Sequence, residues 1–463
     1  MVDKKISMII PDFMENKQVD FERILNEHIE AVFCELIVVT EQKQFFNKNL
    51  IKKIPVSIIE QKGEFLHSLN KAFEVAQGEL LYVQSVSDSL DIGAVKRAAK
   101  LISDNYDKIN ISFFPQNKED SSDMVEGLYH VMLEQKFVPG VFNFVIKKEY
   151  SKLDETLVPR ASYLKFIIDA MDDTKYYGYT KQGYQKHLSG IFDPYRYEAV
   201  NSYESYCKYY DFLLEYMDKK CLETKHAPWL VQVLLIKSLD EVLMKNSLIP
   251  ENYTADQKVI LKRKIQQIID LVEVKALLAS GKIGRYHLVY LFTFRSNGMV
   301  VRSDAGRFGL YDGENKLFSW NKLGFYISGI EKNAGKVYIK GSFQNPISSF
   351  VTINYFLGKN GETTKIQTKD CKISYRNTPQ KISDCQEYIL EVSVDEDREN
   401  YFEAEVLNNK FPITIIYDKA KEEDHGEKKV VQIKEIEVII TCHDTIQIRK
   451  LSFLERCKLK FFS

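Results

Sequence analysis

The sequence predicts an α/β domain followed by a helical region and a C-terminal all-β domain. In the first third of the chain, short apolar runs alternate with amphipathic helical patterns, which is typical of a sheet with parallel strands. Helical spacing of apolar and aromatic residues continues from about residue 202 to 280, and from about residue 286 the period changes to two. We therefore place an α/β domain at 1–200, helices at 201–282, a β-sandwich at 283–445 and a basic, apolar tail at 446–463.

The opening elements are expected to form a β-α-β unit. Residues 6–11 are an apolar run typical of a strand, a helix is predicted from about residue 19 to 31, and residues 36–39 are predicted to be the second strand. The next helix stops at Gly78, where we expect a left-handed residue. A short apolar strand follows and leads into a polar loop. Loops at the carboxyl ends of such strands are where open α/β sheets bind ligands.

The order and spacing of these elements resemble glycosyltransferase family 2, whose members have the GT-A fold and transfer a sugar from a nucleotide sugar. The resemblance covers roughly residues 5 to 190. It implies a GT-A (nucleotide-diphospho-sugar transferase-like) domain. The nucleotide-binding positions that it implies are Pro11, Thr40, Glu41, Lys62, Asn70, Ser85 and Ser87.

The chain departs from this family where the family has acids. Two aspartates usually hold the base and ribose, and here Thr40 and Glu41 occupy those positions, of which Glu41 is able to accept a ribose hydroxyl. The family's Asp-x-Asp motif, which binds Mg²⁺ or Mn²⁺, is replaced by Ser85, Val86, Ser87 and Asp88. Serine hydroxyls supply no charge to a hard divalent cation. We therefore expect at most a weak metal site at Asp88, with Asp91 nearby.

A third departure lies in the part that the resemblance assigns to the acceptor. Residues 153–157 resemble the family's Phe-Asp-Glu-x-Leu segment, and Asp154 and Glu155 are present. The family's general base belongs to an acidic pair that follows, and the matching residues here are Ser162 and Tyr163. Neither is a base near neutral pH, since an ordinary tyrosine has a pKa of ~10. Replacement bases at Asp169, Asp172 or Asp173 are an alternative, although the helical pattern favours a solvated face there.

These departures favour a glycosyltransferase-2-like protein of bacterial surface-polysaccharide or glycoprotein glycan assembly with weakened or lost catalysis. One alternative is an active, divergent inverting glycosyltransferase that uses a nucleotide sugar. The other is a non-catalytic scaffold partner of an active transferase. The expected partners are a nucleotide sugar, a glycan or lipid-linked acceptor, and another transferase or a second copy of this chain.

Composition indicates a cytoplasmic protein with more than one domain. The chain has 463 residues, of which 44% are hydrophobic, enough to fill a core in each domain. A net charge of −1 gives no general attraction to nucleic acid, so none is expected as a partner. No apolar run approaches the ~20 residues of a membrane span, and the N-terminus lacks a signal peptide's apolar region. The seven cysteines are odd in number and scattered, which predicts reduced thiols.

The helical region is expected to bury its aromatic residues. Its second helix begins near Trp229, and residues 228–232 resemble a Pro-x-x-x-Gln helix that follows the transferase domain in long family members of bacterial capsule and teichoic-acid pathways. In the β-sandwich, hairpins are expected at Asp312-Gly313 and Asn360-Gly361. Aromatic residues in its strands are either a platform for carbohydrate or ordinary strand residues. The platform candidates are Tyr326, Phe343 and Tyr375.

The tail is expected to contact a membrane surface. Residues 449–462 contain five basic and seven apolar residues, a mixture that favours the anionic inner leaflet. This interpretation makes the protein peripheral at the inner face of the membrane. A partner-binding or disordered end is the alternative.

Overall fold

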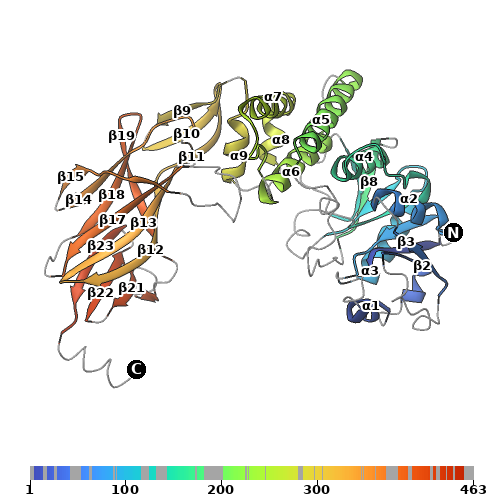
Figure 1. Ribbon diagram of the computed structural model, residues 1–463, viewed down its shortest axis with the longest axis horizontal. Coiled ribbons are helices and arrows are strands. Elements are labelled where there is room, and N and C mark those ends of the chain that lie inside the picture. The colour runs from blue at the N-terminus through green and yellow to red at the C-terminus, as the bar shows by residue number, and fades with distance from the viewer. Residues whose placement is uncertain are drawn as a thin grey trace. The chain divides into compact units, whose positions relative to one another are not determined.

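The protein is described here by a computed structural model (Figure 1). It describes residues 5–13, 18–25, 29–41, 54–61, 65–86, 89, 91–115, 125–131, 143–172, 175–181, 202–224, 227, 229–245, 247–279, 285–296, 298–304, 306–345, 347, 349–359, 361–371, 384–394, 399–417, 421–423, 428–433, 435–441 and 444–452. The chain divides into two compact units. The first comprises Met1–Glu241 and Ile249–Ile283, and the second comprises Val242–Leu248 and Gly284–Ser463.

The first unit contains, within the described residues, an eight-stranded mixed sheet of order β3-β2-β1-β4-β7-β5-β8-β6. Its strands are β1 (Ile6–Phe13), β2 (Phe33–Thr40), β3 (Val56–Glu60), β4 (Leu80–Val83), β5 (Ile111–Phe113), β6 (Gly127–His130), β7 (Phe144–Lys147) and β8 (Tyr176–Tyr179). The pairs β3–β2, β2–β1 and β1–β4 are parallel, whereas β7 is antiparallel to both β4 and β5. Nearly every side chain of β2 is buried, as expected for a central strand covered on both faces.

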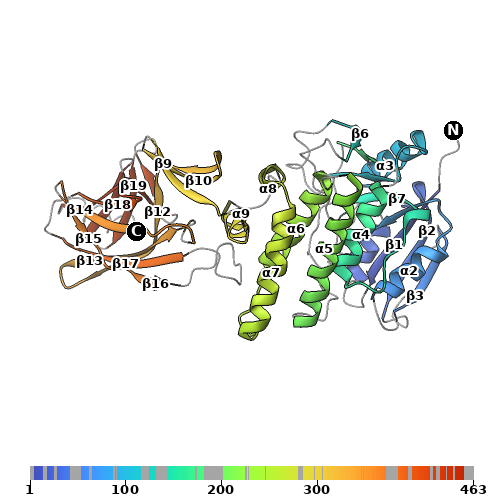
Figure 2. The ribbon, with the colours of Figure 1, turned by 90° about the horizontal axis from the view of Figure 1, so that it is seen from above.

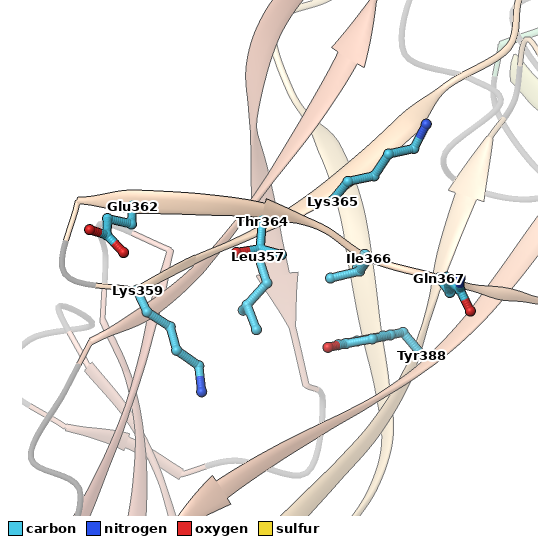
Figure 3. A pocket seen from close by; sticks show the side chains of 8 residues that line it. All are labelled: Leu357, Lys359, Glu362, Thr364, Lys365, Ile366, Gln367 and Tyr388. Atoms are coloured by element: carbon cyan, nitrogen blue, oxygen red, sulfur yellow. The ribbon is translucent and has the colours of Figure 1, made fainter.

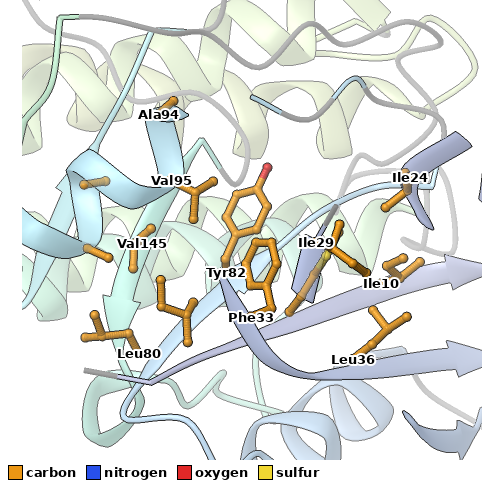
Figure 4. Close-up of a cluster of buried hydrophobic side chains, with 14 of the residues drawn as sticks. Ile10, Ile24, Ile29, Phe33, Leu36, Leu80, Tyr82, Ala94, Val95 and Val145 are labelled. Atoms are coloured by element: carbon orange, nitrogen blue, oxygen red, sulfur yellow. The ribbon is translucent and has the colours of Figure 1, made fainter. Parts of the chain in front are cut away.

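Helices cover both faces of this sheet (Figures 1 and 2). They are α1 (Gln18–Leu25), α2 (Phe65–Val75), α3 (Ile92–Asp104) and α4 (Pro159–Asp172). On one face, Phe21 of α1 and Val95 of α3 join strand residues such as Tyr82 in a buried apolar cluster (Figure 4). On the other face, the rings of Phe73 in α2 and Phe166 in α4 stack with their centroids 6.1 Å apart. The predicted α/β domain is confirmed.

The connection from α2 to β4 is held by a buried polar group. Gly78 N donates to Ser7 Oγ at 2.8 Å, and the Ser7 hydroxyl donates to the buried carboxylate of Glu35 at 2.5 Å. Glu35 also accepts a hydrogen bond from the backbone of Gln77. Our expectation of a left-handed Gly78 is wrong, because the described glycines with positive φ do not include it. Glycine is needed there since a Cβ would lie 2.5 Å from Ser7 N.

The helical region packs into the first unit. Its helices are α5 (Tyr203–Thr224), α6 (Trp229–Lys245), α7 (Ala255–Leu271) and α8 (Val274–Ala279). Helix α5 contacts both α4 and α7 (Figure 2), and its aromatic residues are buried as predicted. The Gln232 amide, 1% exposed, donates to Ala227 O at 2.8 Å and accepts from Glu273 N at 2.8 Å. Gln232 therefore joins the start of α6 to the junction between α7 and α8.

The main part of the second unit, from Gly284 on, contains α9 (Arg285–Phe292) and then strands. The strands are β9 (Val300–Asp304), β10 (Arg307–Asp312), β11 (Asn315–Trp320), β12 (Leu323–Asn333), β13 (Lys336–Asn345), β14 (Asn354–Lys359), β15 (Glu362–Lys365), β16 (Lys369–Cys371), β17 (Asp384–Ser393), β18 (Asn400–Val406), β19 (Asn409–Ile416), β20 (Lys421–Glu423), β21 (Lys428–Ile433), β22 (Ile436–Thr441) and β23 (Thr445–Lys450). Strands β11-β10-β9 form a small sheet, and the others join one large sheet. The predicted all-β region is confirmed.

The large sheet folds so that two of its parts pack face to face. Strand β19 pairs with β18 through Asn409–Pro412 and with β12 through Ile413–Ile416, so it belongs to both parts. The ring of Phe343 in β13 lies 4.3 Å from that of Tyr355 in β14, although these strands are not sheet neighbours. Aromatic side chains from the two parts therefore form a shared core, as in a sandwich.

Some details of the second unit differ from expectation, and others lie outside the described part. Phe343 is 0% exposed, so it is a core residue and not part of a carbohydrate platform, while Tyr375 lies outside the described residues. Residues 446–450, which were expected to belong to the tail, are part of β23, where Ile446 and Ile448 are buried. Residues 453–463 lie outside the described part. Within the described ranges, no helix combines the length and apolar character that crossing a membrane requires.

Candidate functional site

The strand order of the first unit marks one edge of the sheet as the place for a ligand. From β1 the chain moves to β2 and β3 on one side, and it then returns to place β4 on the other side of β1. The order therefore reverses between β1 and β4. In open α/β sheets, the crevice outside the carboxyl ends of the strands at such a switch point is the usual ligand site. The candidate site thus lies at the carboxyl ends of β1, β2 and β4.

The structure brings four of the predicted residues to this edge. Pro11 is buried near the end of β1, and Thr40, the last residue of β2, is 1% exposed. Glu41 follows Thr40 and is exposed. Ser85 lies just after β4 and is 2% exposed. Three of these four residues are thus buried at this edge, and Glu41 is exposed.

Backbone pairing fixes these strand ends relative to one another. Phe13 of β1 pairs with Thr40 of β2, and Gln84 N donates to Ile9 O at 2.9 Å. The carbonyl of Thr40 accepts from Gln61 N at 2.8 Å, which ties the exit of β3 to that of β2. The buried side chain of Gln84 accepts a hydrogen bond from the Tyr82 hydroxyl. The positions of these strand ends are thus set by backbone pairing.

The predicted metal site receives no support from the described residues. Lys62, Ser87 and Asp88 lie outside them, so their roles stay predictions. Asp91 caps α3, since its carboxylate accepts from Ala94 N at 2.9 Å. In the described part of the chain, no three His, Cys, Asp or Glu side chains gather where they could hold a metal ion.

Asn70 forms hydrogen bonds within the first unit. It is 6% exposed on α2, and its amide nitrogen donates to Leu153 O and to Glu155 Oε1, both at 2.8 Å. Its amide oxygen accepts from Leu153 N at 2.8 Å. Glu155 also contacts His67 Nδ1 at 3.1 Å. Asn70 therefore holds the 153–155 loop against α2, and its contact with a nucleotide stays a prediction.

Hydrogen bonds from Asn70, and then from His67, lower the pKa of the Glu155 carboxyl below its usual value. The 153–155 loop is fixed further by Asp154, whose carboxylate accepts from the Thr156 hydroxyl at 2.6 Å and from Thr156 N at 3.1 Å. This is the side-chain turn that Asp commonly forms with the residue two positions later. Both acids of the Phe-Asp-Glu-x-Leu-like segment thus contribute to the shape of the loop.

The two residues at the family's base position are buried in α4. Ser162 is 0% exposed, and its hydroxyl has no hydrogen-bond partner among the described residues. Tyr163 is 5% exposed and lies with its ring centroid 6.4 Å from that of Phe166. Asp169 accepts from the Tyr216 hydroxyl at 3.0 Å and from Lys165 at 2.6 Å, which joins α4 to α5. The side chain of Asp172 and all of Asp173 lie outside the described part.

We expect Asn70→Ala to lower the free energy of unfolding of the first unit by about 2 kcal/mol, because it leaves the backbone groups of Leu153 without their partner. The pKa of Glu155 should rise toward its ordinary value in the same variant, since its strongest hydrogen bond is lost. Urea unfolding and NMR titration of the Glu155 carboxyl measure the two effects. An unchanged Glu155 pKa would contradict the described contact.

Comparisons with known proteins reveal similarity to solved structures only. No family model and no curated protein matches this sequence. TarS of S. aureus matches with a TM-score of 0.46 and 12% identity, over 97% of this chain and 86% of that chain. TarS 1-349 in complex with UDP-GlcNAc matches with a TM-score of 0.47 and 12% identity, over 67% of this chain and 98% of that one.

Glucosyl-3-phosphoglycerate synthase of Mycobacterium tuberculosis, in complex with Mn²⁺, UDP and glucosyl-3-phosphoglycerate, also matches. Its TM-score is 0.29 and its identity 12%, over 40% of this chain and 72% of that chain. All three identities are low and all three TM-scores are below 0.5. These are likenesses of fold, and the function of this chain has to be inferred from its own residues.

Proposed function

We propose that the first unit binds a nucleotide sugar at the carboxyl ends of β1, β2 and β4. We further propose that the protein is a glycosyltransferase-2-like protein of bacterial surface-polysaccharide or glycoprotein glycan assembly, with weakened or lost catalysis. The observation that carries the proposal is the reversal of strand order between β1 and β4. The reversal brings together Pro11, Thr40, Glu41 and Ser85, which the sequence resemblance assigns to the nucleotide.

The chemistry of this edge suits the nucleotide part of such a ligand. The exposed Glu41 supplies a carboxylate that is an acceptor for ribose hydroxyls, and the buried Pro11 and Thr40 lie beside it at the ends of β1 and β2. The Ser85 hydroxyl is able to donate to a phosphate oxygen but adds no charge. Among these four residues Glu41 has the only carboxylate, so the set fits a diphosphate-bound divalent cation poorly. Metal binding by this chain depends on Asp88, which stays a prediction.

Weakened catalysis is supported by the surroundings of α4. An inverting transfer to an acceptor hydroxyl needs a group that removes the hydroxyl proton, and such a base must reach the substrate. Ser162 and Tyr163 are buried, and Asp169 is engaged with Tyr216 and Lys165. The contacts of these three side chains therefore fit a role in holding the structure together.

The test is calorimetric titration of the full chain with UDP, UDP-glucose and UDP-N-acetylglucosamine, with and without Mn²⁺. We expect binding of at least one nucleotide and about a tenfold weaker affinity in Glu41→Gln, the effect of losing one charged hydrogen bond. Glu149→Gln is the matched control. Glu149 is exposed and follows the end of β7, where Lys147 pairs with Leu80 at the opposite edge of the sheet.

A second variant tests whether the nucleotide site itself is lost or whether it lacks only the acidic residues that bind the metal ion. Ser85→Asp, Ser87→Asp restores acids at the motif positions, and we expect it to bind nucleotide more tightly when Mn²⁺ is present. If neither the parent nor this variant binds any of the nucleotides, the proposed function is wrong. If the parent turns over a nucleotide sugar with release of UDP, the protein is the active divergent enzyme, and the proposal that catalysis is weakened or lost is wrong.

A further inference from the structure

The second unit contains a cavity beside its β14–β15 hairpin. Its volume is about 770 Å³, within the range of ~300–1,000 Å³ that is usual for small-molecule sites. It lies between the β14–β15 hairpin and strand β17 (Figure 3). The residues that line it are Leu357, Lys359, Glu362, Thr364, Lys365, Ile366, Gln367 and Tyr388.

The pairing of the hairpin places several of these side chains on one face. Leu357 pairs with Thr364, and Lys359 pairs with Glu362. Because directly paired residues of antiparallel strands share a face, and residues two apart do so as well, these four side chains lie on the same side of the hairpin. Tyr388 of β17 lies on the other side of the cavity (Figure 3). Three separate strands thus contribute to one concave surface.

Tyr388 is anchored on the aromatic core and remains half-buried. Its ring centroid lies 5.9 Å from that of Phe402, edge to face, and 6.4 Å from that of Phe343. A ring held in this way offers a rigid apolar surface at little entropic cost. Leu357 and Ile366 extend the apolar surface beside it. The cavity therefore has a firm apolar floor.

The polar groups around this floor have no partners in the described part of the protein. The Lys359 ammonium and the Glu362 carboxylate form no ion pair with any described residue, although they are cross-strand neighbours. The side-chain amide of Gln367 and the hydroxyl of Tyr388 likewise form no hydrogen bond with a described residue. Donors and acceptors are therefore available at several points around one apolar surface.

The charges that line the cavity nearly cancel. Lys359 and Glu362 share the inner face of the hairpin, and Lys365, which also lines the cavity, leaves an excess of one positive charge. A phosphate-rich ligand such as a nucleic acid would need several unpaired positive charges, and this surface has an excess of only one. A purely apolar ligand would leave the polar rim without hydrogen bonds. The surface is best matched by a neutral molecule with an apolar face and a rim of hydroxyl groups.

We propose that this cavity binds neutral carbohydrate, with a pyranose ring stacked on Tyr388 and its hydroxyls bonded to Lys359, Glu362 and Gln367. A pyranose ring has C–H groups on its faces and hydroxyls around its edge, and each hydroxyl both donates and accepts. Lys359 supplies donors only, Glu362 supplies acceptors only, and Gln367 supplies both. This site belongs to the second unit and does not depend on the nucleotide site of the first.

The test uses the full chain and a panel of neutral gluco-, chito-, manno-, galacto- and xylo-oligosaccharides at millimolar concentration. Binding is followed by saturation-transfer NMR and measured by calorimetry. We expect at least one oligosaccharide to bind, with about tenfold weaker affinity in Lys359→Ala, Glu362→Ala, since two hydrogen-bonding groups are lost. Both residues are at least partly exposed, so this variant should fold normally. Tyr388→Ala should abolish the binding.

Lys410→Ala is the matched control. The Lys410 ammonium donates to the Thr363 hydroxyl at 2.9 Å and lies 5.0 Å from the ring centroid of Phe356. The control variant therefore removes a lysine that lies against the outer face of the same hairpin. Its affinity for the oligosaccharide should equal that of the parent. If no member of the panel binds, the proposal is wrong. It is also wrong if binding is equal in the parent and in the Lys359→Ala, Glu362→Ala variant, because the sugar then binds elsewhere.

Discussion

Gly78→Ala is expected to lower the free energy of unfolding of the first unit by about 3 kcal/mol. A Cβ at this position would lie 2.5 Å from Ser7 N, 2.6 Å from Ser7 Oγ and 2.9 Å from Ile6 C. Two of these three atoms belong to the backbone of β1, which pairs on both sides and cannot move aside cheaply. A movement of residue 78 away from β1 would also lengthen the hydrogen bond from its backbone nitrogen to Ser7 and disturb the contact of Ser7 with Glu35.

Urea unfolding followed by tyrosine fluorescence and far-UV circular dichroism measures this effect. Gly127→Ala is the matched control, because Gly127 is also in a strand of this sheet and a Cβ there meets no atom within 4 Å. The control should change stability by less than about 1 kcal/mol. Equal unfolding midpoints for the two variants would contradict the close approach of β4 and β1 at this point. Since β4 leads to Ser85, Gly78→Ala should also weaken any nucleotide binding.

Phe402→Ala is expected to destabilise the second unit by about 3–5 kcal/mol, the usual cost of deleting a buried phenylalanine ring. Phe402 is 1% exposed. Its ring centroid lies 4.6 Å from that of Phe325 and 5.2 Å from that of Phe343, which come from the opposite part of the folded sheet. The deletion therefore opens a cavity where the two parts meet.

Phe356→Ala provides the comparison on the neighbouring strand. Phe356 pairs with Glu403, directly after Phe402, so its side chain lies on the outer face, where it is partly exposed beside Lys410. We expect a loss of about 1 kcal/mol or less for this variant. Thermal unfolding of both variants measures the difference. Equal losses would contradict the assignment of Phe402 to the shared core of the sheet.

The order of the elements was predictable because apolar periodicity depends on local sequence. The change from helical spacing to a period of two correctly separates the helices from the strands of the second unit. Hairpin residues are similarly local, and Gly313 and Gly361 have positive φ at their turns. Gly78 shows the limit of such reasoning. A helix stop and a close backbone approach both favour glycine, and only the packing of β4 on β1 distinguishes them.

The candidate site was predictable only in part. The ends of parallel strands follow from their order, which places Thr40, Glu41 and Ser85 at one edge. Side-chain partners do not follow from order, so the use of Asn70 to hold the 153–155 loop was missed. The cavity beside Tyr388 was missed for the same reason, because its walls come from separate strands. Platform and core were both open for Phe343, because a strand aromatic carries no local signal of the face it occupies.

The double pairing of β19 also constrains the order in which the second unit is assembled. Leu323, at the start of β12, pairs in parallel with Ile413, far along the chain, and β18 pairs with β23 through Asn400 and Ile446. Long loops must close before such contacts form, which makes them slow steps in folding. During synthesis, one edge of β12 is left without its partner until β19 has emerged from the ribosome. All residues of the first unit have been synthesised by then, so the first unit can fold before the last strands of the second unit have been made.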